Sequence, residues 1–209
     1  MQSCTLTKSR NNIAGIHYTT NHTGKMSGLV SLSTDINSNP LCLARQKNGA
    51  AVCSACFASR MFDDNSGRYR GVNTAFKHNT EILTARILDN SELPTIDAEK
   101  YPLFRFEAYG DLINTTQAIN YIKIARKNPR VKFALWSKNP AFAVAAFRIA
   151  GKPDNLQFVL SSLKLNRPAA GADRVPYVDK VFTVYDSEHA AGGVDQLRGA
   201  VLFWVPSLL

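Results

Sequence analysis

Residues 103–160 decide the fold of this chain, and they read LFRFEAYGDLINTTQAINYIKIARKNPRVKFALWSKNPAFAVAAFRIAGKPDNLQFVL. Three apolar runs in this stretch predict strands, and the two segments between them have the apolar spacing of helices. Strands that alternate with helices in this way predict a mostly parallel sheet. The strands are expected at residues 103–106, 131–136 and 156–160, and the helices at residues 115–127 and 140–150.

The same pattern continues on both sides of this stretch. Residues 28–33 alternate like a strand, and residues 73–89 have helical spacing with Asn73 as the predicted N-cap. Two further strands are predicted at residues 180–184 and 200–205. The chain is therefore expected to be an α/β protein with about six mostly parallel strands. A compact or partial (βα) barrel fits this pattern best.

Composition and charge restrict the class of protein. The chain has 209 residues and is 45% hydrophobic, which suits one domain over residues 1–209, with a polar and irregular N-terminal extension over residues 1–28. No apolar run is long enough to span a bilayer, and residues 1–12 lack the apolar core of a signal peptide. We therefore expect no membrane contact and a cytoplasmic location. The net charge of +9 favours an anionic partner, such as a nucleic acid.

Three of the four cysteines are clustered, as Cys42, Cys53 and Cys56, with the spacing C-x10-C-x2-C. We call these three residues the cysteine triad. On a helix or in a tight turn, the last two thiols would point to one side. In a reducing cytosol such clusters more often bind metal than form disulfides. Tetrahedral zinc and cubane iron–sulfur sites normally take four ligands. Either Cys4 completes the site, or one metal position stays open for a non-cysteine ligand or substrate.

Polar residues follow the central predicted strands. Glu107, Gly110 and Asp111 follow one strand, and Lys138 follows the next. Ligands of parallel α/β folds bind at the carboxyl ends of strands, so we expect these four residues to line a pocket beside the cysteine triad. Two carboxylates near a glycine can bind an amine, a metal or ribose hydroxyls, and a positive φ at Gly110 would make it sensitive to substitution. Lys138 is expected to pair with a carboxylate or with an anionic ligand.

Three ordered elements resemble the phage gene product 88 family. They are residues 25–33, KMSGLVSLS, followed by Cys42 and residues 53–58, CSACFA; residues 105–111, RFEAYGD; and residues 133–138, FALWSK. The family has a C-x2-C-[YF]-A element, an R-x4-G-D element and a later strand ending near Thr/Ser-Lys. The resemblance implies a phage-encoded protein that works in the cytoplasm of a bacterial host.

The cysteine and glycine elements are in turn similar to those of radical S-adenosylmethionine enzymes. In those enzymes a cysteine loop after the first barrel strand holds a [4Fe-4S] cluster with one open iron, and an acidic, glycine-containing element binds the methionine amine. The similarity implies a fold like that of these enzymes (radical-SAM-like) and a cluster held by the cysteine triad. It also implies an S-adenosylmethionine pocket lined by the residues that follow the central strands, with Glu107, Gly110 and Asp111 nearest the cluster. The first cysteine spacing is ten residues here, where the usual enzyme loop has three.

The residues and the resemblance leave three functions open. The open iron of the cluster would bind S-adenosylmethionine in an enzyme. In a non-enzymatic module the cluster would be a structural or redox element of a protein that binds nucleic acid or a host protein. A structural zinc site formed with Cys4 is the third alternative. We expect that Cys4 is not an obligatory ligand, because it lies in a polar N-terminal segment far from the triad in sequence.

Overall fold

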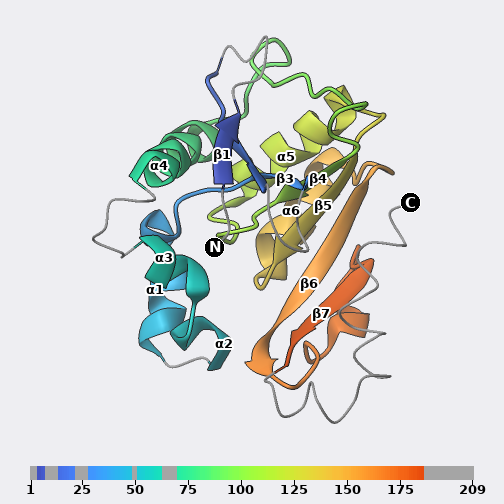
Figure 1. Cartoon of the computed structure of the whole chain (residues 1–209). Helices are drawn as coiled ribbons and strands as arrows, with labels where there is room; N and C mark the ends of the chain where they lie inside the picture. Colours follow the sequence, from blue (N-terminus) through green and yellow to red (C-terminus); the bar gives the residue numbers. More distant parts are fainter. Residues whose placement is uncertain (1–3, 8–13, 22–27, 49–50, 63–69, 186–209) are drawn as a thin grey trace.

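The computed structural model describes residues 4–7, 14–21, 28–48, 51–62 and 70–185. Its centre is a seven-stranded sheet in which the strands lie side by side in chain order (Figure 1). The strands are β1 (Cys4–Thr7), β2 (Tyr18–Asn21), β3 (Val30–Leu32), β4 (Leu103–Phe106), β5 (Lys132–Ser137), β6 (Leu156–Leu165) and β7 (Lys180–Val184).

Strand direction divides the sheet into two parts. β1, β2 and β3 pair antiparallel, and each neighbouring pair from β3 to β7 is parallel. The mostly parallel α/β sheet predicted from the sequence is therefore confirmed. In the described part of the chain β1 and β7 are the two edges of the sheet, so the strands do not close into a barrel. Five parallel strands fall short of the roughly eight that enclose a filled barrel interior.

The N-terminal segment differs from the prediction. The sequence predicts irregular structure over residues 1–28, and yet β1 and β2 lie there and extend the sheet beyond β3. The reason is that β2 contains Thr19 and Thr20, which are polar but β-branched and so suit a strand. The strand predicted at residues 200–205 lies outside the described residues.

Three longer helices connect the parallel strands, namely α4 (Arg70–Ala85), α5 (Thr115–Lys127) and α6 (Pro140–Ala150). The Asn114 side chain caps α5 by accepting from the Gln117 N–H, and Asn139 caps α6 in the same way ahead of Pro140. These two helices begin and end where the sequence predicts. None of the helices in the described ranges is long and apolar enough to cross a membrane.

Helix α4 corrects one predicted boundary. Asn73 lies inside this helix, three residues after its first residue, and so it is not the N-cap that the sequence predicts. The helix also ends at Ala85 rather than near residue 89. Apolar spacing sets which face of a helix is buried, but it fixes the ends of the helix only loosely.

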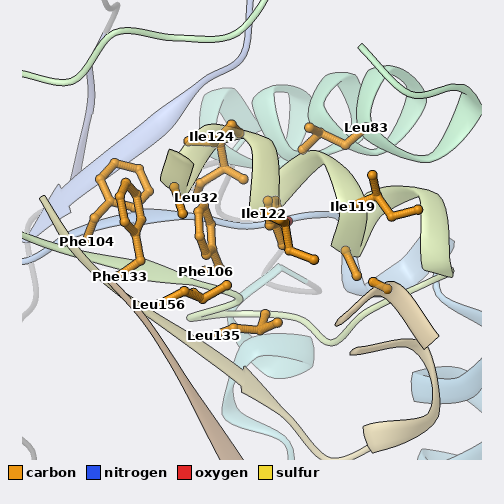
Figure 2. Packing of buried hydrophobic residues seen from close by; sticks show 14 of the residues in the cluster. Leu32, Leu83, Phe104, Phe106, Ile119, Ile122, Ile124, Phe133, Leu135 and Leu156 are labelled. Carbon is orange, nitrogen blue, oxygen red and sulfur yellow. The ribbon is translucent and has the colours of Figure 1, made fainter. Parts of the chain in front are cut away.

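The main core lies between the sheet and helices α4–α6. Figure 2 shows Phe104, Phe106 and Phe133 of the parallel strands in one cluster with Ile122 and Ile124 of α5. Alternate residues of each strand point to this side, because the side-chain period of a strand is two. The aromatic rings stack closely, with centroids of Phe106 and Phe133 separated by 5.1 Å. This packing holds the parallel strands, and therefore their carboxyl ends, at fixed positions relative to one another.

The chain between β3 and α4 forms a short 3-10 helix and three short α-helices near the carboxyl ends of the parallel strands (Figure 1). α2 contacts the long strand β6 there. This segment contains the whole cysteine triad, and the residues that follow β4 and β5 lie at the same edge of the sheet. The elements are η2 (Ile36–Ser38), α1 (Pro40–Lys47), α2 (Ala51–Ser54) and α3 (Phe57–Phe62).

Candidate metal centre and its polar network

The triad lies on the short helices because local capping starts them there. Asn39 caps α1 through its side-chain oxygen, which accepts from the N–H groups of Leu41 and Cys42, and Pro40 occupies the first turn. Cys42 is therefore in the first turn of α1. Cys53 lies in α2, and its carbonyl accepts from the Cys56 N–H at 3.2 Å. The two later cysteines thus share a tight turn, as their spacing predicts.

All three thiols of the triad are free and partly exposed. Cys42 and Cys56 pack against a small apolar cluster that includes Phe76 and Tyr109, whereas Cys53 does not. The described residues contain no group of three or more His, Cys, Asp or Glu side chains arranged around one point as metal ligands. The structure therefore brings the cysteines to one region without closing them into a coordination shell.

The charges around the thiols show which residues are their neighbours. Burial raises the pKa of the Cys42 thiol, and the carboxylates of Asp111 and Glu107 raise it further, while Lys138 lowers it. Burial also raises the pKa of Cys53, against the lowering effect of Lys138 and Arg45. Residues after β4 and β5 thus lie close enough to act on the cysteine segment. A cation beside a thiol favours the thiolate, which is the form that binds metal.

Asp111 joins three elements at the carboxyl edge. Its carboxylate accepts from the Ser137 hydroxyl at 2.5 Å and from the Lys138 N–H at 3.1 Å, and it forms an ion pair with Arg45 at 3.3 Å. Arg45 also donates to the Lys138 carbonyl at 3.3 Å. Asp111 therefore ties the loop after β4 to the end of β5 and to α1. It is the backbone of Lys138, and not its ammonium group, that bonds to this carboxylate.

Glu107 has a different environment from the one expected for a ligand-binding carboxylate. It is buried, and its Oε1 atom accepts from Tyr121 at 2.5 Å, Gln117 at 2.6 Å and Thr34 at 3.1 Å. Its backbone has a φ of 57°, which is uncommon for a residue with a side chain. The carboxyl group is thus held by α5 and by the loop after β3. Tyr121 and Gln117 are four residues apart on α5, a helical spacing that the sequence already contained.

Gly110 is constrained by its neighbours and not by its backbone angles. The sequence left a positive φ at Gly110 open, and Gly110 is absent from the positive-φ glycines of the described chain. A Cβ atom at this position would lie 2.6 Å from Oε2 of Glu107 and 3.1 Å from the carbonyl oxygen of Thr34. Only a glycine lets the backbone approach the Glu107 carboxyl group this closely.

Glu107 makes stability depend on pH in a direction that can be measured. Burial raises its pKa from an ordinary value of 4.5 to about 8, against the lowering effect of the Tyr121 and Thr34 hydrogen bonds. The folded state therefore holds a proton that the unfolded state has lost, and the free energy of unfolding should fall as the pH rises from about 5 to about 8. Urea unfolding across this range measures the effect, and Glu107→Gln should flatten this part of the curve.

Glu92→Gln is the matched control for this pH dependence. Glu92 pairs with Arg86, which lowers its pKa, so it is ionised in both the folded and the unfolded state across this range. The control should keep the slope of the unmodified protein. A Glu107→Gln variant that keeps the full slope would show that another group is responsible.

The fold and the site together define an α/β protein with an open, largely parallel sheet and a cysteine- and carboxylate-containing edge. The family model described as gene product 88 matches residues 5–202. The chain belongs to this family, as the three sequence elements indicated, and the match extends well beyond them. No curated protein and no solved structure matches the chain.

Proposed function

We propose that this protein is an iron–sulfur protein whose cluster is held by Cys42, Cys53 and Cys56 beside the carboxyl edge of the sheet. The observation that carries the proposal is the shared environment of the thiols. Cys53 raises the pKa of Cys42, Cys56 raises that of Cys53, and Lys138 lowers the pKa of both Cys42 and Cys53. All three cysteines are free, and thiolates are the ligands that iron–sulfur clusters take.

Loading of the cluster requires the triad to be drawn together. α1 has eight residues and α2 has four, and helices this short are not stable by themselves. The positions of α1 and α2 therefore depend on what these helices pack against. A cluster bound to all three thiols would fix the two helices relative to each other. Metal binding of this kind is coupled to local folding.

The position of Cys4 favours a three-cysteine site over a closed zinc site. Cys4 lies in β1, which is separated from β3 by β2. Neighbouring strands are about 4.8 Å apart, so this strand lies roughly 10 Å across the sheet from the strand that leads into the cysteine segment. Three thiolates leave one iron of a [4Fe-4S] cluster open, whereas a structural zinc site uses four protein ligands.

The proposal extends to S-adenosylmethionine as the ligand of the open iron. Lys138 lies near Cys42 and Cys53, where its ammonium group suits a carboxylate, and Asp111 supplies a negative charge on the same side. When bound to a reduced cluster, S-adenosylmethionine supplies the radical chemistry. Glu107 has a supporting role in this proposal, because its carboxyl group already binds Tyr121, Gln117 and Thr34.

Metal and sulfide analysis of anaerobically purified protein tests the proposal. We expect iron and acid-labile sulfide in comparable amounts, together with the broad visible absorption of thiolate-bound iron. Stoichiometric zinc without sulfide would establish the zinc alternative. A folded protein without either metal would overturn both readings.

Electron paramagnetic resonance of the reduced protein then separates the enzyme from the non-enzymatic module. Added S-adenosylmethionine should change the spectrum if it binds the open iron, and product analysis would detect its cleavage. An unchanged spectrum would indicate a redox or structural cluster. In that case the net charge of +9 makes an anionic partner, such as a nucleic acid, the next candidate to test.

A further inference from the structure

The sheet face that points away from helices α4–α6 has its own chemistry. In the sheet register Ser31 lies beside Arg105, and Arg105 lies beside Ala134. Trp136 and Val159 form the next row, and with Ala134 they are buried in a second apolar cluster that also contacts Phe182. This face, which we call the Arg105 face, therefore combines an apolar cluster with small hydroxyl groups and Arg105, and the register adds the polar residues Lys132, Gln157 and Lys180 to it.

Arg105 is a shielded cation without a counter-ion among the described residues. Its Nε atom is buried and has no hydrogen-bond partner. None of the ion pairs of the described chain includes Arg105. Tyr109 and Glu107 are near enough to raise the pKa of Arg105. Tyr109 is a phenol rather than a carboxylate, and the Glu107 carboxyl group is bound to Tyr121 and Gln117 on the helix side of the sheet.

Trp136 determines the orientation of the Arg105 guanidinium group. The Arg105 Cζ atom lies 4.0 Å from the centre of the Trp136 ring system. Such a contact covers the flat face of a guanidinium and leaves its N–H donors, which lie in the plane of the group, at the edge. Burial lowers the pKa of Arg105 to about 10, so the side chain still carries its charge at neutral pH.

A half-buried arginine whose Nε atom is buried and unpaired matches a planar anion. Guanidinium N–H groups bind carboxylate and phosphate oxygens in pairs, and the bonds are strong because both partners are charged. A buried charge without such a partner destabilises the fold. The arginine is therefore better explained by a bound anion than by a contribution to folding.

We propose that the Arg105 face binds a small ligand through a carboxylate or phosphate group, with Arg105 as the anion-binding residue and Trp136 as the platform that orients it. The site uses no cysteine, so it is independent of the metal centre and goes beyond the proposed function. Arg105 is the last residue but one of β4, which places a ligand here close to the carboxyl edge.

Inorganic phosphate and acetate, each compared with chloride at equal ionic strength, test this site in the full-length protein. Both anions should raise the melting temperature, because a ligand that binds only the folded state stabilises it. Fluorescence of Trp136 in a Trp204→Phe background, which leaves one tryptophan, gives the dissociation constant. Arg105→Met should weaken phosphate binding by about tenfold or more, since it removes charged hydrogen bonds.

Two comparisons make the result decisive. Arg148→Met removes an exposed cation from α6 and should leave phosphate binding unchanged, which excludes a general charge effect. Without phosphate, Arg105→Met should be as stable as the unmodified protein or more so, because it removes an unpaired buried charge. The proposal is wrong if phosphate stabilises the unmodified protein and Arg105→Met equally, or stabilises neither. Lower stability of Arg105→Met in phosphate-free buffer would also contradict it, since that would show that Arg105 stabilises the fold through contacts within the chain.

Discussion

Replacement of Cys53 by alanine is expected to remove the iron and the visible absorption of anaerobically purified protein while leaving it folded. Cys53 is the best member of the triad for this test, because it is not part of the apolar cluster that Cys42 and Cys56 contact. Loss of iron therefore cannot be attributed to a disturbed core. Iron and sulfide content measure the cofactor, and far-ultraviolet circular dichroism measures the fold. Cys42→Ala and Cys56→Ala should lose the cluster as well.

Cys4→Ser is the matched control, since it removes the one cysteine outside the triad. β1, which contains Cys4, belongs to the antiparallel part of the sheet, so this variant should retain its iron. A loss of iron equal to that of the triad variants would show that four cysteines bind the metal. Full iron content in Cys53→Ala would remove this residue from the ligand set.

Gly110→Ala is expected to cause the largest loss of stability among single-methyl changes at this edge of the sheet. The new Cβ atom would meet the Glu107 carboxyl oxygen at 2.6 Å, a distance at which one of the groups must move. Glu107 cannot move freely, because Tyr121, Gln117 and Thr34 hold its other oxygen. Overpacking of a tight site typically costs about 1–3 kcal/mol, and we expect the upper part of that range in urea unfolding.

Two further variants identify the cause of this loss. Gly171→Ala places a methyl group in open space at a φ of 68°, so it should show only the backbone effect of about 1 kcal/mol. In a double variant, Glu107→Asp shortens the clashing side chain and should offset part of the Gly110→Ala loss, which makes the two changes non-additive. Strict additivity, or a Gly110→Ala protein of normal stability, would contradict the steric explanation.

The elements that the sequence predicted well are those with a strong local pattern. Helices α5 and α6 begin after asparagine caps and end where their apolar spacing ends, and β4 to β6 start within one residue of the predicted positions. Periodicity, caps and strand runs are properties of neighbouring residues, so they can be read without the fold. The antiparallel strand β2 was missed because its threonines are polar, although they are β-branched and suit a strand once they pair with β3.

The site was predictable in composition but not in the roles of its residues. The order of strands indicated that Glu107, Asp111 and Lys138 would lie at the same edge as the cysteines, and the charges acting on Cys42 show that they are its neighbours. The sequence did not reveal that Arg45 is the cation paired with Asp111, or that Gln117 and Tyr121 bind Glu107. Those partners come from different elements, and no local pattern connects them.

The sequence by itself determined the alternation of strands and helices, the clustering of three cysteines and the membership of the gene product 88 family. Only the tertiary structure decided that the sheet stays open in its described part, that Gly110 is restricted by a carboxyl group, and that Arg105 is shielded without a counter-ion among the described residues. The physical reason is distance along the chain. Thr34 and Glu107 are separated by 73 residues and Arg45 and Asp111 by 66, and parallel pairing of the strands brings each pair into contact.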